Sequence, residues 1–428
     1  MAWRTLAYSV LLMCAVPASM ADFTLDIVGG SDSATPIAVV PFGGPNLDDN
    51  PGYIINNDLK NSGVFRTVDA LNFPAHPVSS SEVFYHDWAH VGSDYLVVGN
   101  TSEDALGLYE THYELLSISG KKRIMGETLT FNASQWRDAA HQIADHIYQR
   151  ITGVRGAFAT RIAYVHRHMG AHGLRYALRI ADSDGHRVQN ILESDASIIS
   201  PSWSPNAEKI AYVSFEGGRS MVYIQDLRTR ARQKVAAFDG INGAPAWSPD
   251  GKTLAMALSR SGNPEIWLMN LATGSFSQLT HDPSINTEPC WYPDGQHLAF
   301  TSDRGGYPQI YKISLQGGDV QRLTFDGNYN ASCAISPDGS KMAVVHRERG
   351  QTFQIAVQDL GSGEMTILSQ SRLDRSPSFA PNGNMLVYAT MHQNQGMLAL
   401  ISPDGRVKVL LPEQQGESGE PAWSPFLH

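Results

Sequence analysis

The chain has 428 residues, 42% of them hydrophobic and 17% charged, which excludes both a single small fold and a disordered polymer. With 32 basic and 42 acidic residues the formal net charge is −10, so the chain lacks the basic surface that nucleic acid or anionic lipid requires. We expect two folded domains, or one domain followed by a repeat array, and no nucleic-acid partner.

Residues 1–21 have the pattern of a secretory leader. Arg4 precedes an apolar run of 11 residues, Leu6 to Val16, and the small-residue site Ser19-Met20-Ala21 follows. The run is too short for a membrane span, which needs about 20 residues. We therefore expect export and cleavage after Ala21, with a mature chain that begins at Asp22.

Residues 22–33 form a short arm ahead of the first domain. Apolar and polar residues alternate along it with the period of a β-strand. The residues concerned are Asp22, Phe23, Thr24, Leu25, Asp26, Ile27 and Val28. Two interpretations remain open: a detachable strand that adds to the sheet edge of a partner, or an edge strand of the protein's own sheet.

The segment 34–157 mixes helical and strand periodicities and predicts an α/β domain. Helices are expected over 53–61 and 135–151, where apolar side chains recur at helical spacing. Strands are expected over 37–42, 95–99, 109–117 and 123–131. The domain should end near residues 152–160, because strands of a different pattern begin after them.

The remainder, residues 158–428, is built on a repeat of constant length. The proline of a Ser-Pro-Asp-Gly-like turn recurs every 44 residues, at Pro205, Pro249, Pro293, Pro337, Pro381 and Pro425. Within a unit, short segments of alternating apolar and polar residues indicate antiparallel strands joined by type I turns. A four-stranded unit of this length has the size of one β-propeller blade.

The two ends of the repeat are incomplete and complement each other. Three strands within 162–192 lack a first strand, whereas Pro421 to Ser424 forms a first strand without the other three. Joined, these two pieces complete a sixth blade. We therefore predict an all-β six-bladed β-propeller that is closed by the C-terminal strand.

Propellers also support enzymes, and a hydrolase or lyase acting on peptides or glycans is the alternative to a binding function. The sequence contains no Gly-x-Ser-x-Gly elbow and no phosphate-binding glycine loop. His86 and His90 have the spacing of metal ligands on a helix, but no third ligand is assured. We expect no catalytic residues, no metal site and no cofactor, and we expect His166, His168 and His172 to lie at the surface.

Two pairs of residues in the repeat bear on the propeller. Glu288 and Glu420 occupy the same repeat position near the inner strands, where they either hold a cation in the channel or are simply hydrated. Cys290 and Cys333 differ by 43 residues, one short of the repeat, and so face opposite sides of their strands. We therefore expect no disulfide between them.

Several motifs together resemble the TolB family of periplasmic propellers. They are the junction Gly153-Val154-Arg155-Gly156-Ala157-Phe158, the repeat itself, Asn242-Gly243-Ala244-Pro245, Asn286-Thr287-Glu288-Pro289 and the terminal Pro421-Ala422-Trp423-Ser424-Pro425. The resemblance covers essentially the whole chain after residue 21.

The resemblance implies a non-enzymatic periplasmic adaptor of the Tol-Pal system, attached to membranes only through its partners. These are the outer-membrane lipoprotein Pal, bound by one propeller face, and TolA, bound by the arm, with other envelope proteins as further partners. The implied role is maintenance of outer-membrane integrity and constriction during cell division. The Pal-facing loops correspond here to Asn242, Gly243, Ala244, Asn286, Thr287 and Glu288. Family members often carry a histidine where this chain has Ile241.

Overall fold

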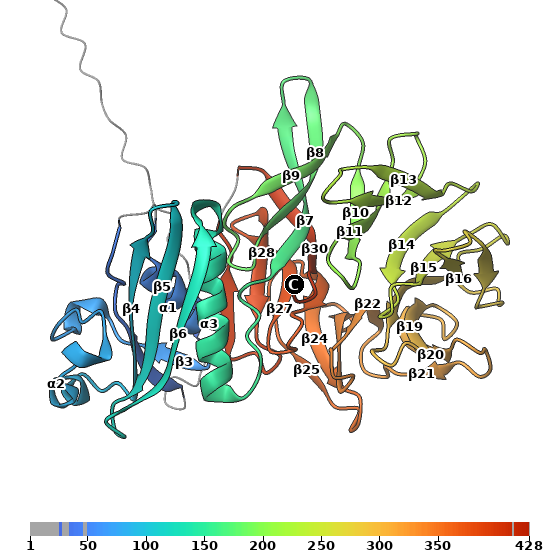
Figure 1. The fold of residues 1–428 in the computed structure, drawn as a ribbon. Helices are drawn as coiled ribbons and strands as arrows, with labels where there is room; N and C mark the ends of the chain where they lie inside the picture. Colours follow the sequence, from blue (N-terminus) through green and yellow to red (C-terminus); the bar gives the residue numbers. More distant parts are fainter. Residues whose placement is uncertain (1–24, 28–33, 46–48, 413–414, 428) are drawn as a thin grey trace, which may run out of the picture.

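The computed structural model describes residues 25–27, 34–45, 49–412 and 415–427, and it places two domains side by side (Figure 1). The leader predicted for residues 1–21 lies outside the described residues. Within the described part of the chain, no helix is both long and apolar enough to cross a membrane.

A five-stranded sheet forms the centre of the N-terminal domain, in the order β3-β2-β4-β5-β6. Strand β2 (Thr35–Val39) runs parallel to β3 (Phe65–Thr67) and β4 (Tyr95–Glu103). Strands β5 (Leu108–Ser117) and β6 (Lys122–Asn132) continue the sheet in antiparallel fashion. The strands expected over 95–99, 109–117 and 123–131 are thus present and slightly longer than expected.

Helices α1 (Pro51–Asn61) and α3 (Trp136–Thr152) cover one face of this sheet. Their apolar stripes, including Ile55 and Ile143, form the main core with the sheet. The other face is covered by the short helix α2 (Tyr85–His90) and by the 3-10 turns η1 (Ala70–Asn72) and η2 (Ser80–Glu82). A third such turn, η3 (Ala133–Gln135), leads into α3, which ends at Gly153 with φ 79°.

Six antiparallel blades make up the propeller among the described residues. Blade 1 contains β30 (Glu417–Trp423), β7 (Arg161–Gly170), β8 (Gly173–Asp182) and β9 (Gln189–Ser194). Blade 2 contains β10 (Ile198–Trp203), β11 (Lys209–Ser214), β12 (Met221–Asp226) and β13 (Arg232–Ala236). Blade 3 contains β14 (Asn242–Trp247), β15 (Thr253–Leu258), β16 (Glu265–Asn270) and β17 (Phe276–Gln278). Blade 4 contains β18 (Asn286–Trp291), β19 (His297–Ser302), β20 (Gln309–Ser314) and β21 (Gln321–Arg322).

The last two blades follow the same pattern. Blade 5 contains β22 (Tyr329–Ile335), β23 (Lys341–Arg347), β24 (Gln354–Asp359) and β25 (Met365–Ile367). Blade 6 contains β26 (Arg375–Phe379), β27 (Leu386–His392), β28 (Gln395–Ile401) and β29 (Val407–Leu410). The repeated tetrad turns between the first two strands, as predicted: in blade 3 Gly251 donates its N–H to the carbonyl of Ser248 at 2.9 Å, and the Ser248 hydroxyl bonds to Asp250 at 2.6 Å.

Every inner strand of the described propeller carries a bulge. The register shifts in β10, β14, β18, β22, β26 and β30. The residues with positive φ at these bulges are Ser200, Ala244, Glu288, Ser332, Ser376 and Glu420, with φ between 47° and 53°. They lie 44 residues apart, so the bulge is part of the repeat and re-aims one backbone segment of each blade in the same way.

The predicted closure of the ring is confirmed. Strand β30 pairs antiparallel with β7, with Trp423 opposite Ile162 and Ala422 opposite Ala163. The expectation of a surface position is wrong for His166, which is only 1% exposed. Its Nε2 donates to the carbonyl of Gln415 at 2.9 Å, because β30 covers the strand that carries it. Burial, together with Arg179, lowers the pKa of His166 to about 4, which keeps the ring neutral.

The expectation of no disulfide is also wrong. Cys290 of β18 and Cys333 of β22 are bonded, with their Cα atoms 6.0 Å apart. The two side chains do face opposite sides of their strands, but neighbouring blades stack face to face. A residue on one face of blade 4 therefore meets a residue on the opposite face of blade 5, in an apolar layer that includes Ala299 and Val344.

Candidate functional site

The arm contributes one strand to the propeller. Strand β1 (Leu25–Ile27) pairs antiparallel with β29, with Leu25 opposite Val409 and Ile27 opposite Val407. It extends blade 6 to five strands and does not join the sheet of the N-terminal domain. Of the arm residues singled out in the sequence, Asp22, Phe23, Thr24 and Val28 lie outside the described residues.

Two segments of the propeller carry the other predicted site residues. We call residues 241–244 and 285–288 the rim loops; each consists of the residue before an inner strand, β14 or β18, and the first three residues of that strand, at equivalent repeat positions in blades 3 and 4. Asn242 is fully buried. Its amide donates to the carbonyls of Phe238 at 2.7 Å and Ser220 at 3.1 Å, and its oxygen accepts from the Phe238 N–H. Asn242 therefore shapes its loop from inside.

Asn286 has the same role in the next blade. It is fully buried, and its amide donates to Glu265 at 2.8 Å and to Asp282 at 3.1 Å. Arg304 donates to the Asn286 oxygen at 3.0 Å and to Asp282 at 2.8 Å. Partial burial raises the pKa of Asp282, but hydrogen bonds from Ser284 and Asn286 and the charge of Arg304 lower it further than burial raises it. The carboxyl group therefore stays ionised.

The accessible surface of the rim loops comes from other residues. Gly243, Ala244, Thr287 and Glu288 are all partly exposed. The residues that precede the two asparagines, Ile241 and Ile285, are 49% and 50% exposed. The rim thus presents apolar side chains beside small and hydroxyl groups, with the polar amides turned inward.

The two glutamates at the bulges brace neighbouring blades. Glu288 accepts from the Ser332 N–H at 2.9 Å, the Ser332 hydroxyl at 2.8 Å and the Thr301 hydroxyl at 2.8 Å. Three blades away, Glu420 accepts from the Ser200 N–H at 3.4 Å. Burial raises the pKa of Glu420, and the negative charge of Glu288 raises it further. The positive charge of Arg375 lowers it, but by less. Both side chains therefore connect the inner strands of adjacent blades.

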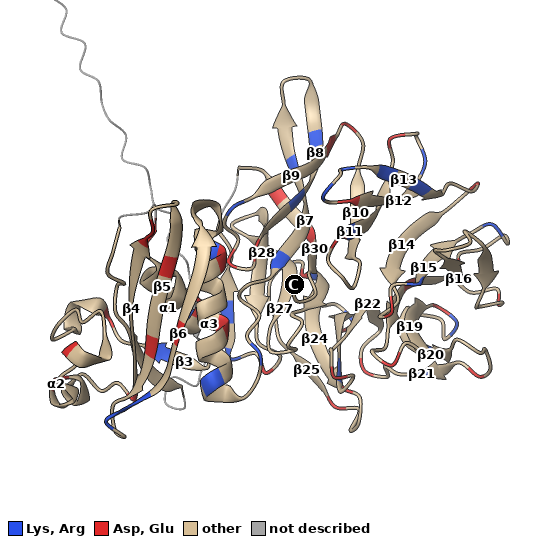
Figure 2. Cartoon of the chain, viewed as in Figure 1, with Lys and Arg blue, Asp and Glu red and all other residues tan. Residues whose placement is uncertain are grey.

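One group of side chains in the described part of the chain has the donor set of a metal site. Ligand atoms of Asp58, His141 and Asp184 lie within 4.8 Å of one another, where α3 carries acidic and basic residues beside the propeller (Figure 2). Arg137 already donates to Asp184 at 2.5 Å. Burial would lower the pKa of His141, but Asp58 and Asp182 raise it to about 10. The surrounding carboxylates therefore favour the charged imidazole, and a metal would have to displace its proton.

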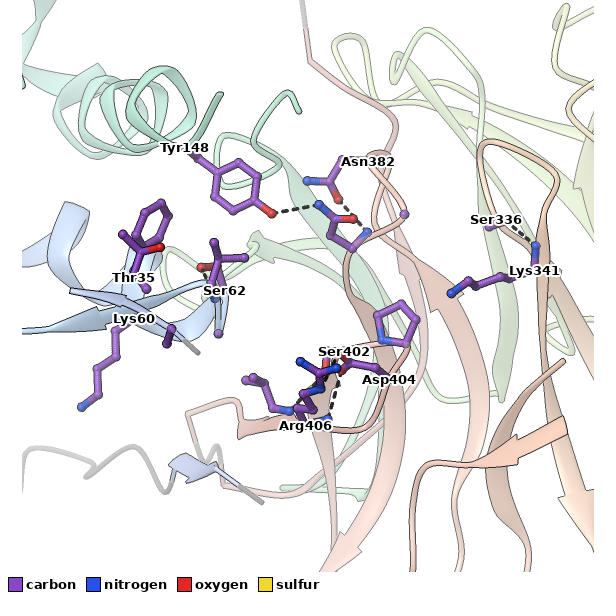
Figure 3. Close-up of a pocket in the computed structure, with 18 of the residues that line it drawn as sticks. Thr35, Lys60, Ser62, Tyr148, Ser336, Lys341, Asn382, Ser402, Asp404 and Arg406 are labelled. Carbon is purple, nitrogen blue, oxygen red and sulfur yellow. Dashed lines mark hydrogen bonds and ion pairs between the residues drawn. The ribbon is translucent and has the colours of Figure 1, made fainter. Parts of the chain in front are cut away.

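A cleft of about 910 Å³ lies between the two domains on the side of β29 (Figure 3). Lys60, Ser62 and Tyr148 line it from the N-terminal domain, and Lys341 and Arg406 line it from the propeller. The Tyr148 hydroxyl bonds to the Asn384 amide at 2.8 Å and thereby connects the domains at one edge of the cleft.

Sequence reasoning missed the residues that hold the rim loops in shape. Ser220, Asp282 and Arg304 come from loops other than the rim loops, and none of them stands out in the sequence. One available signal was the repeat itself, since the buried asparagine recurs 44 residues further on as Asn330. A side chain that recurs at one step of a repeat is more simply explained by blade architecture than by ligand contact.

Comparison with known proteins agrees with this architecture along the whole chain. The TolB amino-terminal domain matches residues 23–124, and the TolB beta propeller domain matches residues 148–427. The chain is 49% identical over 430 residues to the Tol-Pal system protein TolB of Xanthomonas oryzae pv. oryzae, a match that covers 99% of this chain and 98% of the relative. The corresponding protein of Xanthomonas campestris pv. campestris is 48% identical over the same shares.

A solved structure supports the same assignment. The crystal structure of TolB from Acinetobacter baumannii superposes with a TM-score of 0.87 at 43% sequence identity, covering 95% of this chain and 100% of that one. Both domains are therefore matched, in sequence and in space. The chain belongs to the TolB family.

Proposed function

We propose that the protein is a non-enzymatic periplasmic adaptor of the Tol-Pal system. Its relatives are named as Tol-Pal system proteins. In this proposal the leader directs export, the rim loops bind the lipoprotein Pal, and the arm binds TolA. The protein would then link the outer membrane to an inner-membrane partner, and so maintain outer-membrane integrity and constriction during division.

The observation that carries the proposal is the separation of two binding elements on one chain. The rim loops lie at the inner strands of blades 3 and 4, whereas β1 lies on the outer strand of blade 6. A short strand at a sheet edge is held by few backbone hydrogen bonds, so a partner with a free edge competes for it. Two partners can therefore bind at once without sharing a surface.

The chemistry of the rim supports binding over catalysis. Asn242, Asn286 and Glu288 use their polar atoms in hydrogen bonds within the fold. A general acid or base must face a substrate with a free proton-transfer position. The exposed Ile241 and Ile285 instead suit a protein surface, since apolar centres with polar rims are typical of such interfaces.

Deletion of residues 22–33 is expected to abolish capture of TolA and to leave capture of Pal intact or stronger. The deletion removes the arm, which is the segment proposed to bind TolA, and it leaves the rim loops unchanged. Pull-down of both partners from solubilised envelopes measures the effect. A full-length variant with Leu25→Ser and Ile27→Ser serves as the matched control for chain length and should behave like the deletion; unchanged TolA capture by both variants would refute this role of the arm.

Thr287→Arg is expected to weaken Pal binding at least tenfold, about 1.4 kcal/mol. Thr287 is partly exposed beside Ile285, and a long charged side chain there would have to be desolvated on docking. Titration calorimetry with purified Pal measures the affinity. Thr366→Arg, on the exposed outer strand β25, is the control and should bind normally. Equal affinity of both variants would remove the rim loops from the interface.

A further inference from the structure

The two domains meet through a cluster of charged side chains that is largely buried. His141 of α3 is 0% exposed, and its Nδ1 lies 2.7 Å from Oδ2 of Asp58 in α1. On the other side of the ring, Nε2 lies 3.6 Å from Asp182 and 3.8 Å from Asp184, both from the propeller. The imidazole is therefore placed between carboxylates of the two domains.

Further charges cross the same interface in both directions. Arg137 of α3 contacts Asp184 of the propeller at 2.5 Å. In the reverse sense, Asp138 of α3 accepts from Arg161 and from Arg187 of the propeller, each at 2.5 Å. We call this set the charge cluster: Asp49, Asp58, Arg137, Asp138, His141, Arg161, Asp182, Asp184 and Arg187.

His141 is the charge at the centre of this cluster. The charged groups that act on it are Asp58 from α1, Asp145 from α3, and Asp182 and Asp184 from the propeller, and Arg137 of α3 in turn contacts Asp182 and Asp184. The cluster contains three guanidinium groups and five carboxylates, so a cation at His141 reduces the excess of negative charge. Removing one member of such a buried set leaves the others uncompensated.

The position of the arm depends on how the domains are oriented. The chain leaves β1 on the propeller and enters β2 at Thr35 in the N-terminal domain. Close by, Gly63 lies against Val407 of β29, and a Cβ at residue 63 would lie 2.0 Å from the Val407 Cγ2 atom. On this side the cleft of Figure 3 separates the domains. The domains thus touch beside the cleft at Gly63 and through the Tyr148–Asn384 hydrogen bond, and the charge cluster connects them at a part of the interface that does not line the cleft.

We propose that the charge cluster, with His141 at its centre, is an interdomain lock that holds the N-terminal domain in the orientation in which the arm pairs with β29. Loosening the lock lets the domains reorient across the cleft and releases β1 from the propeller. His141 is thus a positioning residue, which acts on the arm through the domain interface. The inference goes beyond the proposed function, because it does not depend on which partner takes the arm.

His141→Gln tests the lock, with His146→Gln as a matched control. His146 lies on the same helix but bonds to Tyr113 and Glu127 inside the N-terminal domain. Two readouts apply at pH 7: amide hydrogen exchange at residues 407–410, and the distribution of distances between spin labels at Leu106→Cys and Phe325→Cys, which are 86% and 70% exposed in the native chain. We expect exchange at least ten times faster and a clearly broader distribution for His141→Gln only.

The pH dependence separates a lock from a merely structural side chain. Because folding raises the pKa of His141 from 6.5 to about 10, its contribution is complete below about pH 6.5 and is lost as the pH rises to 10. The distance distribution of the wild type and of His146→Gln should therefore broaden between pH 7 and pH 10. That of His141→Gln should be broad throughout.

A second variant keeps the proposal testable if His141→Gln does not fold. Asp184→Asn removes one carboxylate from the propeller side, where the side chain is 12% exposed, and should give the same two changes. Folded His141→Gln or Asp184→Asn protein with wild-type exchange at residues 407–410 and a wild-type distance distribution would overturn the proposal.

Discussion

Alanine in place of Trp423 is expected to destabilise the propeller by about 3 to 5 kcal/mol, the usual cost of removing a large aromatic side chain from a core. Trp423 is 8% exposed and packs against Tyr164 and Val387. Its Nε1 donates to the Thr160 hydroxyl at 2.8 Å, and its backbone N–H donates to the Ser378 hydroxyl at 2.9 Å. It therefore joins blade 1 to blade 6 at the point where the ring closes.

Guanidinium unfolding of residues 22–428, followed by circular dichroism, measures this effect. Trp423→Phe is the control, because it keeps most of the apolar area and loses one hydrogen bond, a cost of about 1 kcal/mol from that bond. Removal of residues 417–428 should be more severe, since it exposes the full edge of β7. If Trp423→Ala lowered the free energy of unfolding by less than about 1 kcal/mol, and the protein without residues 417–428 still folded, the ring would not depend on its C-terminal strand.

Loss of the Cys290–Cys333 disulfide is expected to cost about 4 kcal/mol, as the chain-entropy relation gives for a loop of this length. The two cysteines are 43 residues apart and join the inner strands of blades 4 and 5. In the same place, Glu288 bonds to Ser332, so the disulfide reinforces a contact between blades that also involves a rim loop. Reduction should therefore lower the midpoint of unfolding and loosen this side of the rim.

The measurement compares denaturant unfolding with and without a phosphine reductant. The double variant Cys290→Ser/Cys333→Ser should match the reduced wild type within about 1 kcal/mol and should not respond to reductant, which controls for other effects of the reagent. Two free thiols in non-reduced protein of residues 22–428, or no change on reduction, would contradict the disulfide.

The sequence was informative about the propeller because its repeat has a constant step. The prolines at intervals of 44 residues locate the first turn of blades 2 to 6, and the unmatched strand before Pro425 predicts closure of Trp423 against Ile162. Both features are local patterns that recur, and a recurring local pattern needs no knowledge of long-range contacts. Helices α1 and α3 of the N-terminal domain follow from the same kind of periodicity, and α3 begins and ends within one residue of the expected range.

The sequence was misleading where two blades meet. The prediction that Cys290 and Cys333 face opposite sides of their strands is correct. Whether they form a disulfide, however, depends on how one blade stacks on the next, which the pattern of a single strand does not contain. The same limit applies to His166. It belongs to a polar segment, and only the arrival of β30 from the far end of the chain buries it.

The charge cluster could not be predicted from the sequence. Asp58, His141 and Asp184 are separated by many residues and belong to three different elements, so their proximity depends on the packing of one domain on the other. The rim loops are an intermediate case. Their position follows from the repeat, but the burial of Asn242 and Asn286 depends on hydrogen bonds to residues that the repeat does not single out.

Photo-crosslinking in intact cells tests the central claim most directly. A photoreactive amino acid is placed at Thr287 in one strain and at Leu25 in another, and the captured proteins are identified by mass spectrometry. The account predicts that position 287 captures Pal and position 25 captures TolA, because the two surfaces are separate and serve different partners. Capture of the same protein at both positions, or of neither Pal nor TolA at either, would contradict a two-sided adaptor.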